Sequence, residues 1–235
     1  MTKVDTSKNK SKTQADSLGF LFWLKWLASF IWPVKVVTHQ SQEAYLELVL
    51  FQGKRLLNSR NANYSNGNLQ TAYRRLFEEV DLDLSTRHRV LILGFGFGGV
   101  AQLITDANPN ADILGVESNT TILTWYKAYC RQKDNVKVII QDAKEFVSLN
   151  DDTYDLIVCD IYEDLDVPAY FESTSFIQGL SNRLATSGVL VFNKVVQNTD
   201  HKSQFNNLLL ELSSVFRSVL VNEQLGLNRF IIAKK

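Results

Sequence analysis

Hydrophobic and polar positions change their pattern near Arg89. From there on, short and nearly continuous apolar runs alternate with segments in which apolar residues recur every three or four positions. The short runs are typical of strands buried on both faces, and the longer spacing is typical of amphipathic helices. The predicted strands cover residues 90–94, 111–117, 135–140, 154–160 and 188–195. The predicted helices run up to residue 107 and over residues 119–133, 143–149, 174–184 and 201–214.

The carboxyl-terminal segment departs from this alternation. Residues 214–235, "SVFRSVLVNEQLGLNRFIIAKK", predict a strand, a turn and a strand, with no room for a helix between them. Because a parallel neighbour needs a long crossover connection, the last strand must run antiparallel to its neighbour. The pattern therefore predicts an α/β, Rossmann-like fold whose mostly parallel sheet has an antiparallel last strand.

The first third of the chain has a different pattern. Residues 34–58 alternate like strands around Gln52-Gly53, which predicts a β-hairpin. Residues 61–68 are rich in turn formers, and residues 69–80 have helical periodicity. We expect a disordered polar tail at 1–17, an apolar helix at 18–33, a small β-hairpin module at 34–66 and the α/β domain at 67–235.

The apolar run "LGFLFWLKWLASFIW", residues 18–32, is closed by Pro33. It is shorter than the roughly 20 residues of a spanning helix and contains Lys25. The first interpretation is an arm packed on its own protein or on a second subunit of a homodimer. The second is a helix on a membrane surface, with Trp23, Trp26 and Trp32 at the interface. Export is a third interpretation, although no small-x-small cleavage site follows.

Composition narrows the function classes. The formal net charge is zero, so no overall field favours nucleic acid, and we expect no nucleic-acid partner. The two cysteines, Cys130 and Cys159, make no disulfide framework and suggest core thiols in a reducing cytoplasm. The three histidines are scattered along the sequence, so we expect no metal site.

Candidate chemistry gathers where the predicted strands end. Glycines follow the first strand at Gly94–Gly99, where they serve either close backbone contact with a ligand or a tight packing turn. Glu117 ends the second strand, where a carboxylate can accept the hydroxyls of a ribose, unless it is simply solvated. Asp142 follows the third strand and suits an adenine amino group, a helix N-cap or both. Asp160 ends the fourth strand, in a loop that is either functional or merely acidic.

Together, the glycine loop and three acids at successive strand ends favour an adenine-nucleoside site, because the carboxyl ends of parallel strands share one edge of the sheet. The chain also resembles the class I methyltransferase fold, and most closely its spermidine-synthase-like branch. The resemblance lies in "VLILGFGFGGVAQLI", "LGVESN", "VIIQDAKEF", "YDLIVCDIY" and "SGVLVFN". The segment "YLELVLFQGKRLLNSRNANYSNGNLQTAY" resembles the small β-module in front of the aminopropyltransferase domain. The resemblance covers residue 34 to the carboxyl terminus and implies a seven-stranded sheet.

The resemblance also implies roles for individual residues. The glycine loop would line a sulfonium nucleoside, S-adenosylmethionine or its decarboxylated form. Glu117 would hold the ribose, Asp142 the adenine, and Asp160 would orient the attacking group. The candidate cofactor-binding residues are Gly94, Phe95, Gly96, Gly98, Glu117, Ser118, Asp142 and Ala143. The candidate catalytic residues are Asp160, Tyr162 and Glu163, and the candidate residues for a small-molecule acceptor are Tyr64, Gln70 and Tyr73.

Several positions depart from the aminopropyltransferase pattern. Phe97 replaces the aspartate of the glycine loop, and residues 59–77 contain no acid. The Asp-Ser-Ser-Asp motif is only partly preserved at residues 160–163. Each hydrogen bond to a charged group contributes roughly 1.5–3 kcal/mol, so these losses weaken a polyamine site. We therefore expect methyl transfer to a small acceptor first, and aminopropyl transfer as the alternative, with a polyamine site built from Glu163, Asp164 and Asp166.

Two further alternatives remain at this point. Gly94, Gly96 and Gly99 also satisfy the dinucleotide pattern of dehydrogenases, although a second nucleotide-binding half is missing from the sequence. The chain could also be a non-catalytic relative that binds a nucleoside, or a partner through the Trp-rich arm.

Overall fold

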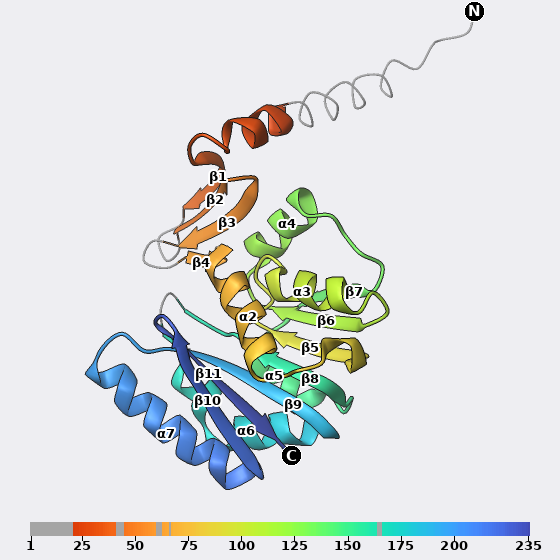
Figure 1. Ribbon diagram of the computed structural model, residues 1–235, viewed down its shortest axis with the longest axis vertical. Helices are drawn as coiled ribbons and strands as arrows, with labels where there is room; N and C mark the ends of the chain where they lie inside the picture. Colours follow the sequence, from red (N-terminus) through yellow and green to blue (C-terminus); the bar gives the residue numbers. More distant parts are fainter. Residues whose placement is uncertain (1–20, 41–44, 60–62, 66, 164–165) are drawn as a thin grey trace, which may run out of the picture. The chain divides into compact units, whose positions relative to one another are not determined.

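The computed structural model describes residues 21–40, 45–59, 63–65, 67–163 and 166–235 (Figure 1). The chain divides into two compact units, Met1–Gly67 and Asn68–Lys235. Each unit has its own sheet and its own buried apolar residues.

The N-terminal unit is built on a four-stranded antiparallel sheet in the order β1-β2-β3-β4. The predicted hairpin is present, since Phe51 pairs with Lys54 across the Gln52-Gly53 turn. Two further strands extend it on either side, and residues 21–28 form a helix ahead of the sheet. The strands are β1 (Val34–Gln40), β2 (Tyr45–Phe51), β3 (Lys54–Ser59) and β4 (Asn63–Ser65).

The larger unit contains a seven-stranded sheet in the order β10-β11-β9-β8-β5-β6-β7. Parallel pairing joins β9, β8, β5, β6 and β7, whereas β11 pairs antiparallel with both β9 and β10. The prediction of a mostly parallel sheet with an antiparallel last strand is confirmed. The strands are β5 (Arg89–Leu93), β6 (Asp112–Glu117), β7 (Val136–Ile140), β8 (Tyr154–Cys159), β9 (Leu184–Val195), β10 (Ser218–Leu225) and β11 (Asn228–Lys234).

Helices cover both faces of this sheet (Figure 1). Successive residues of a strand point to opposite faces, so Val90 and Ile92 of β5 join one core while Leu91 and Leu93 join the other. The first core contains residues of α2 (Gly67–Glu79), α3 (Gly99–Ala107) and α4 (Thr120–Tyr129). The second contains residues of α5 (Ala143–Leu149), α6 (Thr174–Arg183) and α7 (Thr199–Val215). The short helices η1 (Leu84–Thr86) and η2 (Ala169–Glu172) complete the unit.

Element boundaries differ from the sequence prediction at two places. The fourth predicted element after Arg89, helix α4, ends at Tyr129 rather than at Lys133, because Cys130 takes an extended conformation. The Gln132 side chain also donates hydrogen bonds to the carbonyls of Tyr126 and Cys130. Strand β9 begins at Leu184, before the apolar run that predicted it, because Leu184 pairs with Tyr154 of β8.

The two cysteines differ in burial. Cys159 is fully buried, as expected of a core thiol, whereas Cys130 at the end of α4 is partly buried and packs against the core that contains α2, α3 and α4. Among the helices that the structure describes, none is long and apolar enough to cross a membrane.

The order of the strands fixes where a ligand can bind. The chain passes from β5 to β6 and β7 on one side, and then returns to β8 on the other side of β5. The connections after β5 and β8 therefore diverge, and open α/β sheets bind ligands in the crevice at such a point, at the carboxyl ends of the two strands. The glycine loop and Asp160 both lie at this edge.

Candidate nucleoside and acceptor site

The glycine loop joins β5 to α3. Backbone N–H groups of Gly94 and Phe95 both donate to the carbonyl of Val116 on β6, at 3.0 and 3.1 Å. Gly94 has a φ of +79°, and a Cβ at this position would overlap the backbone carbonyl oxygen of Asp160. Gly94 is therefore required by the close approach of the ends of β5 and β8. A Cβ on Gly96 would meet no atom within 4 Å, so Gly96 is the glycine that borders open space.

The aromatic residues of the loop point into the protein. Phe95 is buried and packs edge-on against Tyr126 of α4, with 4.9 Å between ring centroids. Its ring occupies the space that a side chain at Gly115 of β6 would need. Phe97 is also buried. Contact between a ligand and Phe95 would therefore involve the backbone, and the loop presents main chain rather than rings to the open side at Gly96.

Glu117 lies under the glycine loop at the end of β6. One carboxylate oxygen accepts the N–H of Gly96 at 2.9 Å, and the other accepts the N–H of Asn119 at 2.9 Å. The side chain therefore points toward the glycine turn. Burial raises the pKa of Glu117, and the backbone N–H groups of Asn119, Gly96 and Ser118 partly offset this rise. Each carboxylate oxygen has two lone pairs, so both can still accept a ligand hydroxyl.

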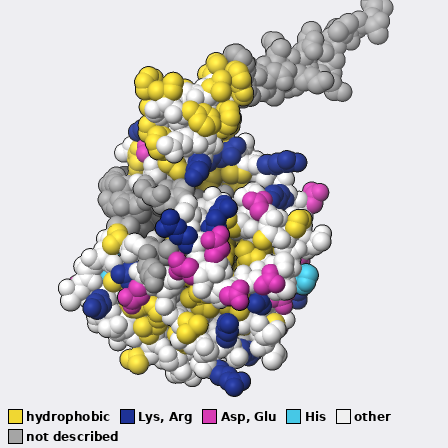
Figure 2. All heavy atoms as spheres, viewed as in Figure 1, with side chains coloured by type: hydrophobic (Ala, Val, Ile, Leu, Met, Phe, Trp, Pro, Cys, Tyr) yellow, Lys and Arg dark blue, Asp and Glu magenta, His cyan; other side chains and the backbone are white. Residues whose placement is uncertain are grey.

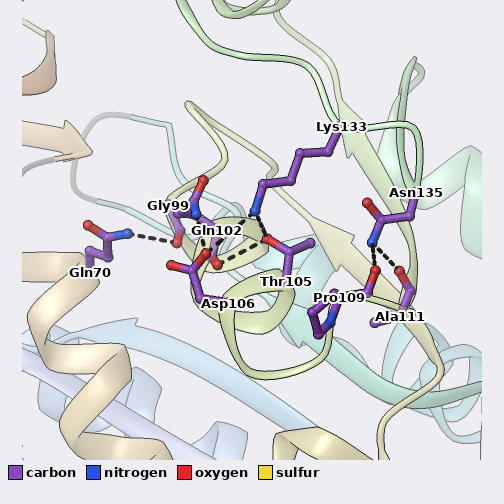
Figure 3. Close-up of polar contacts among 9 residues, drawn as sticks. All are labelled: Gln70, Gly99, Gln102, Thr105, Asp106, Pro109, Ala111, Lys133 and Asn135. Atoms are coloured by element: carbon purple, nitrogen blue, oxygen red, sulfur yellow. Dashed lines mark hydrogen bonds and ion pairs between the residues drawn. The ribbon is translucent and has the colours of Figure 1, made fainter.

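Helix α2 contacts the same region. Gln70 donates from its side-chain amide to the carbonyl of Gly99, the first residue of α3, at 3.2 Å (Figure 3). Lys133 binds Asp106 at 3.5 Å and also donates to Thr105, so the far end of α3 is held as well (Figure 3). The predicted acceptor residue Gln70 thus lies beside the glycine loop.

Asp142 caps α5. It is exposed and accepts the N–H of Lys144 at 2.7 Å through one carboxylate oxygen, while Ala143 behind it is buried. The N-cap role that the sequence suggested is present in the structure. A cap of this kind uses one carboxylate oxygen. An adenine contact by the same side chain remains a prediction.

Asp160 follows β8 on the other side of the loop. Its backbone N–H donates to the carbonyl of Leu93, and its carboxylate accepts the side-chain amide of Asn193 at 2.8 Å. The Tyr73 hydroxyl of α2 lies close enough to the Asp160 carboxylate to lower its pKa. Within the described residues, however, this hydroxyl makes no hydrogen bond of good geometry. Burial raises the pKa of Asp160 to about 6, and Asn193 and Tyr73 limit the rise.

Several buried polar groups surround Asp160 without a hydrogen-bond partner in the part of the chain that the structure describes. They are the hydroxyls of Tyr73 and Tyr162 and the side-chain carbonyl of Asn193. Burial, together with the nearby Asp160 carboxylate, raises the pKa of both tyrosines well above the ordinary value, so both stay neutral hydrogen-bond donors. Leaving a buried polar group unpaired costs about 1–3 kcal/mol, and a bound ligand or water would satisfy such groups.

The loop after Asp160 engages two of the acids that the sequence singled out. Glu163 is exposed and exchanges backbone hydrogen bonds with Asp166. The Asp166 carboxylate contacts the His201 ring of α7 at 2.9 Å. Asp164 lies outside the described residues. One of the three acids proposed for an alternative polyamine site thus already has a basic partner.

Some site residues fall outside this arrangement. Tyr64 belongs to β4 of the N-terminal unit, and its side chain lies outside what the structure describes. Ser118 is exposed beside Glu117. Among the described residues, no group of three or more His, Cys, Asp or Glu side chains is placed to hold a metal ion.

Sequence reasoning missed Asn193 and its neighbour Lys194. Both are almost completely buried in β9, and Lys194 pairs with Glu172 and donates a hydrogen bond to the Gln204 side-chain oxygen at 3.0 Å. The available signal was the pair of polar residues at the end of the apolar run "GVLVFNKV". Because neighbouring residues of a strand face opposite sides of the sheet, Asn193 contacts Asp160 whereas Lys194 contacts Glu172 and Gln204.

A comparison with known protein families matches the larger unit. Residues 90–188 match a family model described as a methyltransferase domain. This segment begins in β5 and ends in β9, so it contains the glycine loop, Glu117, Asp142 and Asp160.

Curated relatives resemble part of the chain. A probable polyamine aminopropyl transferase from Bifidobacterium longum is 29% identical over 149 residues, which are 62% of this chain and 33% of the relative. The chain thus spans about a third of the length of this relative.

The similarity to solved structures covers a larger share of this chain than the similarity to the Bifidobacterium longum relative. A spermidine synthase in complex with the transition-state analogue AdoDATO has a TM-score of 0.69 and 15% identity, over 85% of this chain and 73% of that one. Human methyltransferase-like protein 13 in complex with SAH has a TM-score of 0.59 and 23% identity, over 71% of this chain and 80% of that one. These likenesses establish the fold.

Proposed function

We propose, on the premise that this chain has the spermidine-synthase-like form of the class I methyltransferase fold, that it is a transferase acting on a sulfonium nucleoside. The nucleoside is S-adenosylmethionine or its decarboxylated form. The observation that carries the proposal is the buried carboxylate of Glu117, which accepts the N–H of Gly96 at the edge of open space. A dinucleotide dehydrogenase fits the matched methyltransferase domain less well.

Different residues at this edge of the sheet would contact different parts of the nucleoside. Glu117 would accept the ribose hydroxyls, and the backbone at Gly96 would contact the nucleoside without a side chain between them. Asp142 would take the adenine amino group. These residues lie at the ends of β6, β5 and β7, which are adjacent strands, so an extended nucleoside can contact all three.

Asp160 would act on the group that attacks. The nucleophile's lone pair forms a bond to carbon while the carbon–sulfur bond breaks and its electrons neutralise the sulfonium. The nucleophile then loses a proton, which Asp160 can accept, because its pKa of about 6 leaves it ionised at neutral pH. The neutral hydroxyls of Tyr73 and Tyr162 would help to orient the acceptor. Much of the remaining rate enhancement comes from alignment of nucleophile and carbon.

The relatives favour aminopropyl transfer over the methyl transfer that the sequence pattern alone ranks first. The Bifidobacterium longum relative is named as a polyamine aminopropyl transferase, and spermidine synthases are among the solved structures with this fold. We therefore place aminopropyl transfer from decarboxylated S-adenosylmethionine to an amine first.

Methyl transfer is the second candidate, and a specific observation favours it. Phe97 is buried in the loop position where aminopropyltransferases have an aspartate, and Asp166 is already paired with His201. A primary ammonium of the donor or the acceptor therefore finds fewer carboxylates here than the family pattern supplies. The human methyltransferase-like structure, solved with SAH, shares the fold.

One incubation separates the two candidates. The full chain is mixed with a panel of diamines and monoamines and with either S-adenosylmethionine or its decarboxylated form. Aminopropyl transfer releases methylthioadenosine and methyl transfer releases S-adenosylhomocysteine, and mass spectrometry distinguishes the two by-products. If calorimetry detects no binding of either donor or either by-product, the proposal is wrong at the level of the nucleoside.

Glu117→Ala tests the nucleoside site directly. Loss of a buried carboxylate that holds the ribose should weaken nucleoside binding by about 3 kcal/mol, or about a hundredfold. The control is Asp112→Ala, because Asp112 is an exposed acid at the opposite end of the same strand. Calorimetry is performed on protein whose folded fraction has been checked by circular dichroism. Unchanged affinity in folded Glu117→Ala protein would remove Glu117 from the site.

A further inference from the structure

The helix at residues 21–28 is apolar nearly all round, so apolar side chains stay exposed on the side turned away from the sheet, unlike in an ordinary surface helix, whose apolar stripe faces the protein. The side chains that are partly or fully buried include the polar residues Lys25 and Ser29, together with Trp26. Seven large apolar side chains in and just after the helix are between 42% and 73% exposed. We call them the apolar face: Leu21, Trp23, Leu24, Leu27, Phe30, Ile31 and Trp32.

Hydrogen bonds fix which side of the helix end faces the sheet. The Trp26 indole donates to the carbonyl of Gly53 at 3.1 Å, in the turn between β2 and β3. The N–H of Gly53 donates to the Ser29 hydroxyl at 3.1 Å, and the N–H of Gln52 donates to the Ser29 carbonyl at 2.8 Å. Trp26 and Ser29 thus bind the helix end to the turn of the sheet, and the side chains of the apolar face stay 42–73% exposed. Figure 2 shows hydrophobic side chains gathered over this part of the unit.

The charged residues around the apolar face are mostly basic. Within the described residues 21–40 and 45–59 there are four Lys or Arg residues and one acidic residue, Glu47, which is paired with Lys35 at 2.9 Å. Lys54 and Arg55 are exposed and directly follow the turn that anchors the helix. The Arg55 guanidinium lies 5.7 Å from the centre of the Phe22 ring, so it borders the helix itself.

We propose that the apolar face binds an anionic lipid surface, which would make this a protein that lies on membranes. Apolar side chains with exposed indoles, next to Lys and Arg, are the features of helices that lie in the headgroup region of a bilayer. Anionic headgroups would complement the exposed Lys54 and Arg55, which lie beside the apolar face. The proposal does not depend on which group the crevice transfers.

Two contributions to binding follow from this arrangement. Burial of the apolar face supplies attraction that does not depend on lipid charge. Each basic residue near an anionic surface adds about 1 kcal/mol, which corresponds to roughly a fivefold change in affinity. Removal of Lys54 and Arg55 should therefore weaken binding to anionic vesicles by more than tenfold and leave any weak binding to neutral vesicles unchanged.

Flotation of the full chain with vesicles tests the proposal. The vesicles contain phosphatidylcholine alone or phosphatidylcholine with 30% phosphatidylglycerol. We expect wild type to float with the anionic vesicles, and Leu24→Glu/Ile31→Glu to lose at least tenfold in affinity. Lys54→Gln/Arg55→Gln should lose affinity only for the anionic vesicles. The matched control is Leu210→Glu, because Leu210 is 71% exposed on α7 of the other unit and should float like wild type.

Three results would overturn the proposal. The first is wild type that fails to float at millimolar anionic lipid, and the second is Leu24→Glu/Ile31→Glu protein that floats as well as wild type. The third is a wild-type dimer, measured by light scattering, that Ile31→Glu converts to a monomer while neither protein binds vesicles. In that case the apolar face is an interface between two copies. Circular dichroism and thermal melting establish that each variant is folded.

Discussion

Asp160 shows how far a single residue depends on its tertiary neighbours. Its position at the end of an apolar run marks it as a candidate in the sequence, since parallel strands present their carboxyl ends at one edge. Its raised pKa and its contact with Asn193, however, arise from burial and from a residue 33 positions away. The sequence locates the acid, and the packing around it sets its chemistry.

Replacement of Asp160 by Asn should change the pH dependence of stability. The folded-state pKa, about 6, lies above the ordinary value of 3.8, so the folded protein binds this proton more tightly than the unfolded chain. Stability therefore falls as pH rises from about 4 to about 6, and the full cost is present above pH 6. Asp160→Asn should be more stable than wild type by about 1–3 kcal/mol at pH 8, and equal to it below pH 4. Urea denaturation across this range measures the difference.

The same substitution should also change the pH profile of kcat/KM, by removing the fall in activity at acidic pH, which is the acidic limb of the profile. In wild type, kcat/KM should fall as pH drops through about 6, because protonation removes the base. Asp160→Asn should be nearly inactive and should show no such limb. The exposed Asp134 provides the control Asp134→Asn, which should follow wild type in both measurements. A wild-type profile that is flat between pH 5 and 7 would contradict this role for Asp160.

At the scale of elements, the glycine loop combines two different demands. Gly94 has to leave room for the backbone of β8, whereas Gly96 borders open space, although both have positive φ. The sequence shows four glycines and cannot distinguish these demands, because the neighbour of Gly94 is Asp160, which follows β8 and comes 66 positions later in the chain.

Alanine at these two glycines should therefore give different results. Gly94→Ala should destabilise the larger unit by on the order of 3 kcal/mol or more, because its Cβ would overlap the Asp160 carbonyl oxygen and φ is unfavourable. Gly96→Ala should cost only about 1–2 kcal/mol, which is the strain of a left-handed residue. Its main effect should be on nucleoside affinity, measured by calorimetry. Equal losses of stability in denaturant titrations of the two variants would contradict this assignment.

Element boundaries were predictable where the signal is local. Asn119, Asp142 and Ser173 each cap the helix that follows them, and polar residues of this kind mark helix starts in sequence. The early start of β9 could not be predicted, because residues 185–187 are not buried and the strand extends back only through the pairing of Leu184 with Tyr154 of β8.

At the scale of the whole molecule, the two units have separate sheets and separate buried residues. The crevice lies in the larger unit, between β5 and β8, and the apolar face lies in the N-terminal unit. Nucleoside binding and lipid binding should therefore be separable by mutation.

A bound nucleoside should stabilise the larger unit by mass action. At a hundredfold excess over its dissociation constant, a ligand raises the free energy of unfolding by about 2.7 kcal/mol. For a unit of this size, that should raise Tm by about 5–10 °C. Thermal melts with S-adenosylmethionine, its decarboxylated form, methylthioadenosine and NAD compare the ligands. The first three should stabilise the protein and NAD should not; a shift with NAD alone would favour the dehydrogenase interpretation.

The sequence by itself determined the alternation of strands and helices, the antiparallel end of the sheet and the row of acids after β6, β7 and β8. These features follow from local periodicity and from the rule that parallel strands end at one edge. Only the tertiary structure decided that Phe95 turns into the core, that Asn193 and Tyr73 lie beside Asp160, and that the helix at 21–28 holds its apolar face outward. Each of these outcomes depends on residues distant in the chain, and local patterns of polarity carry no information about which distant residues will meet.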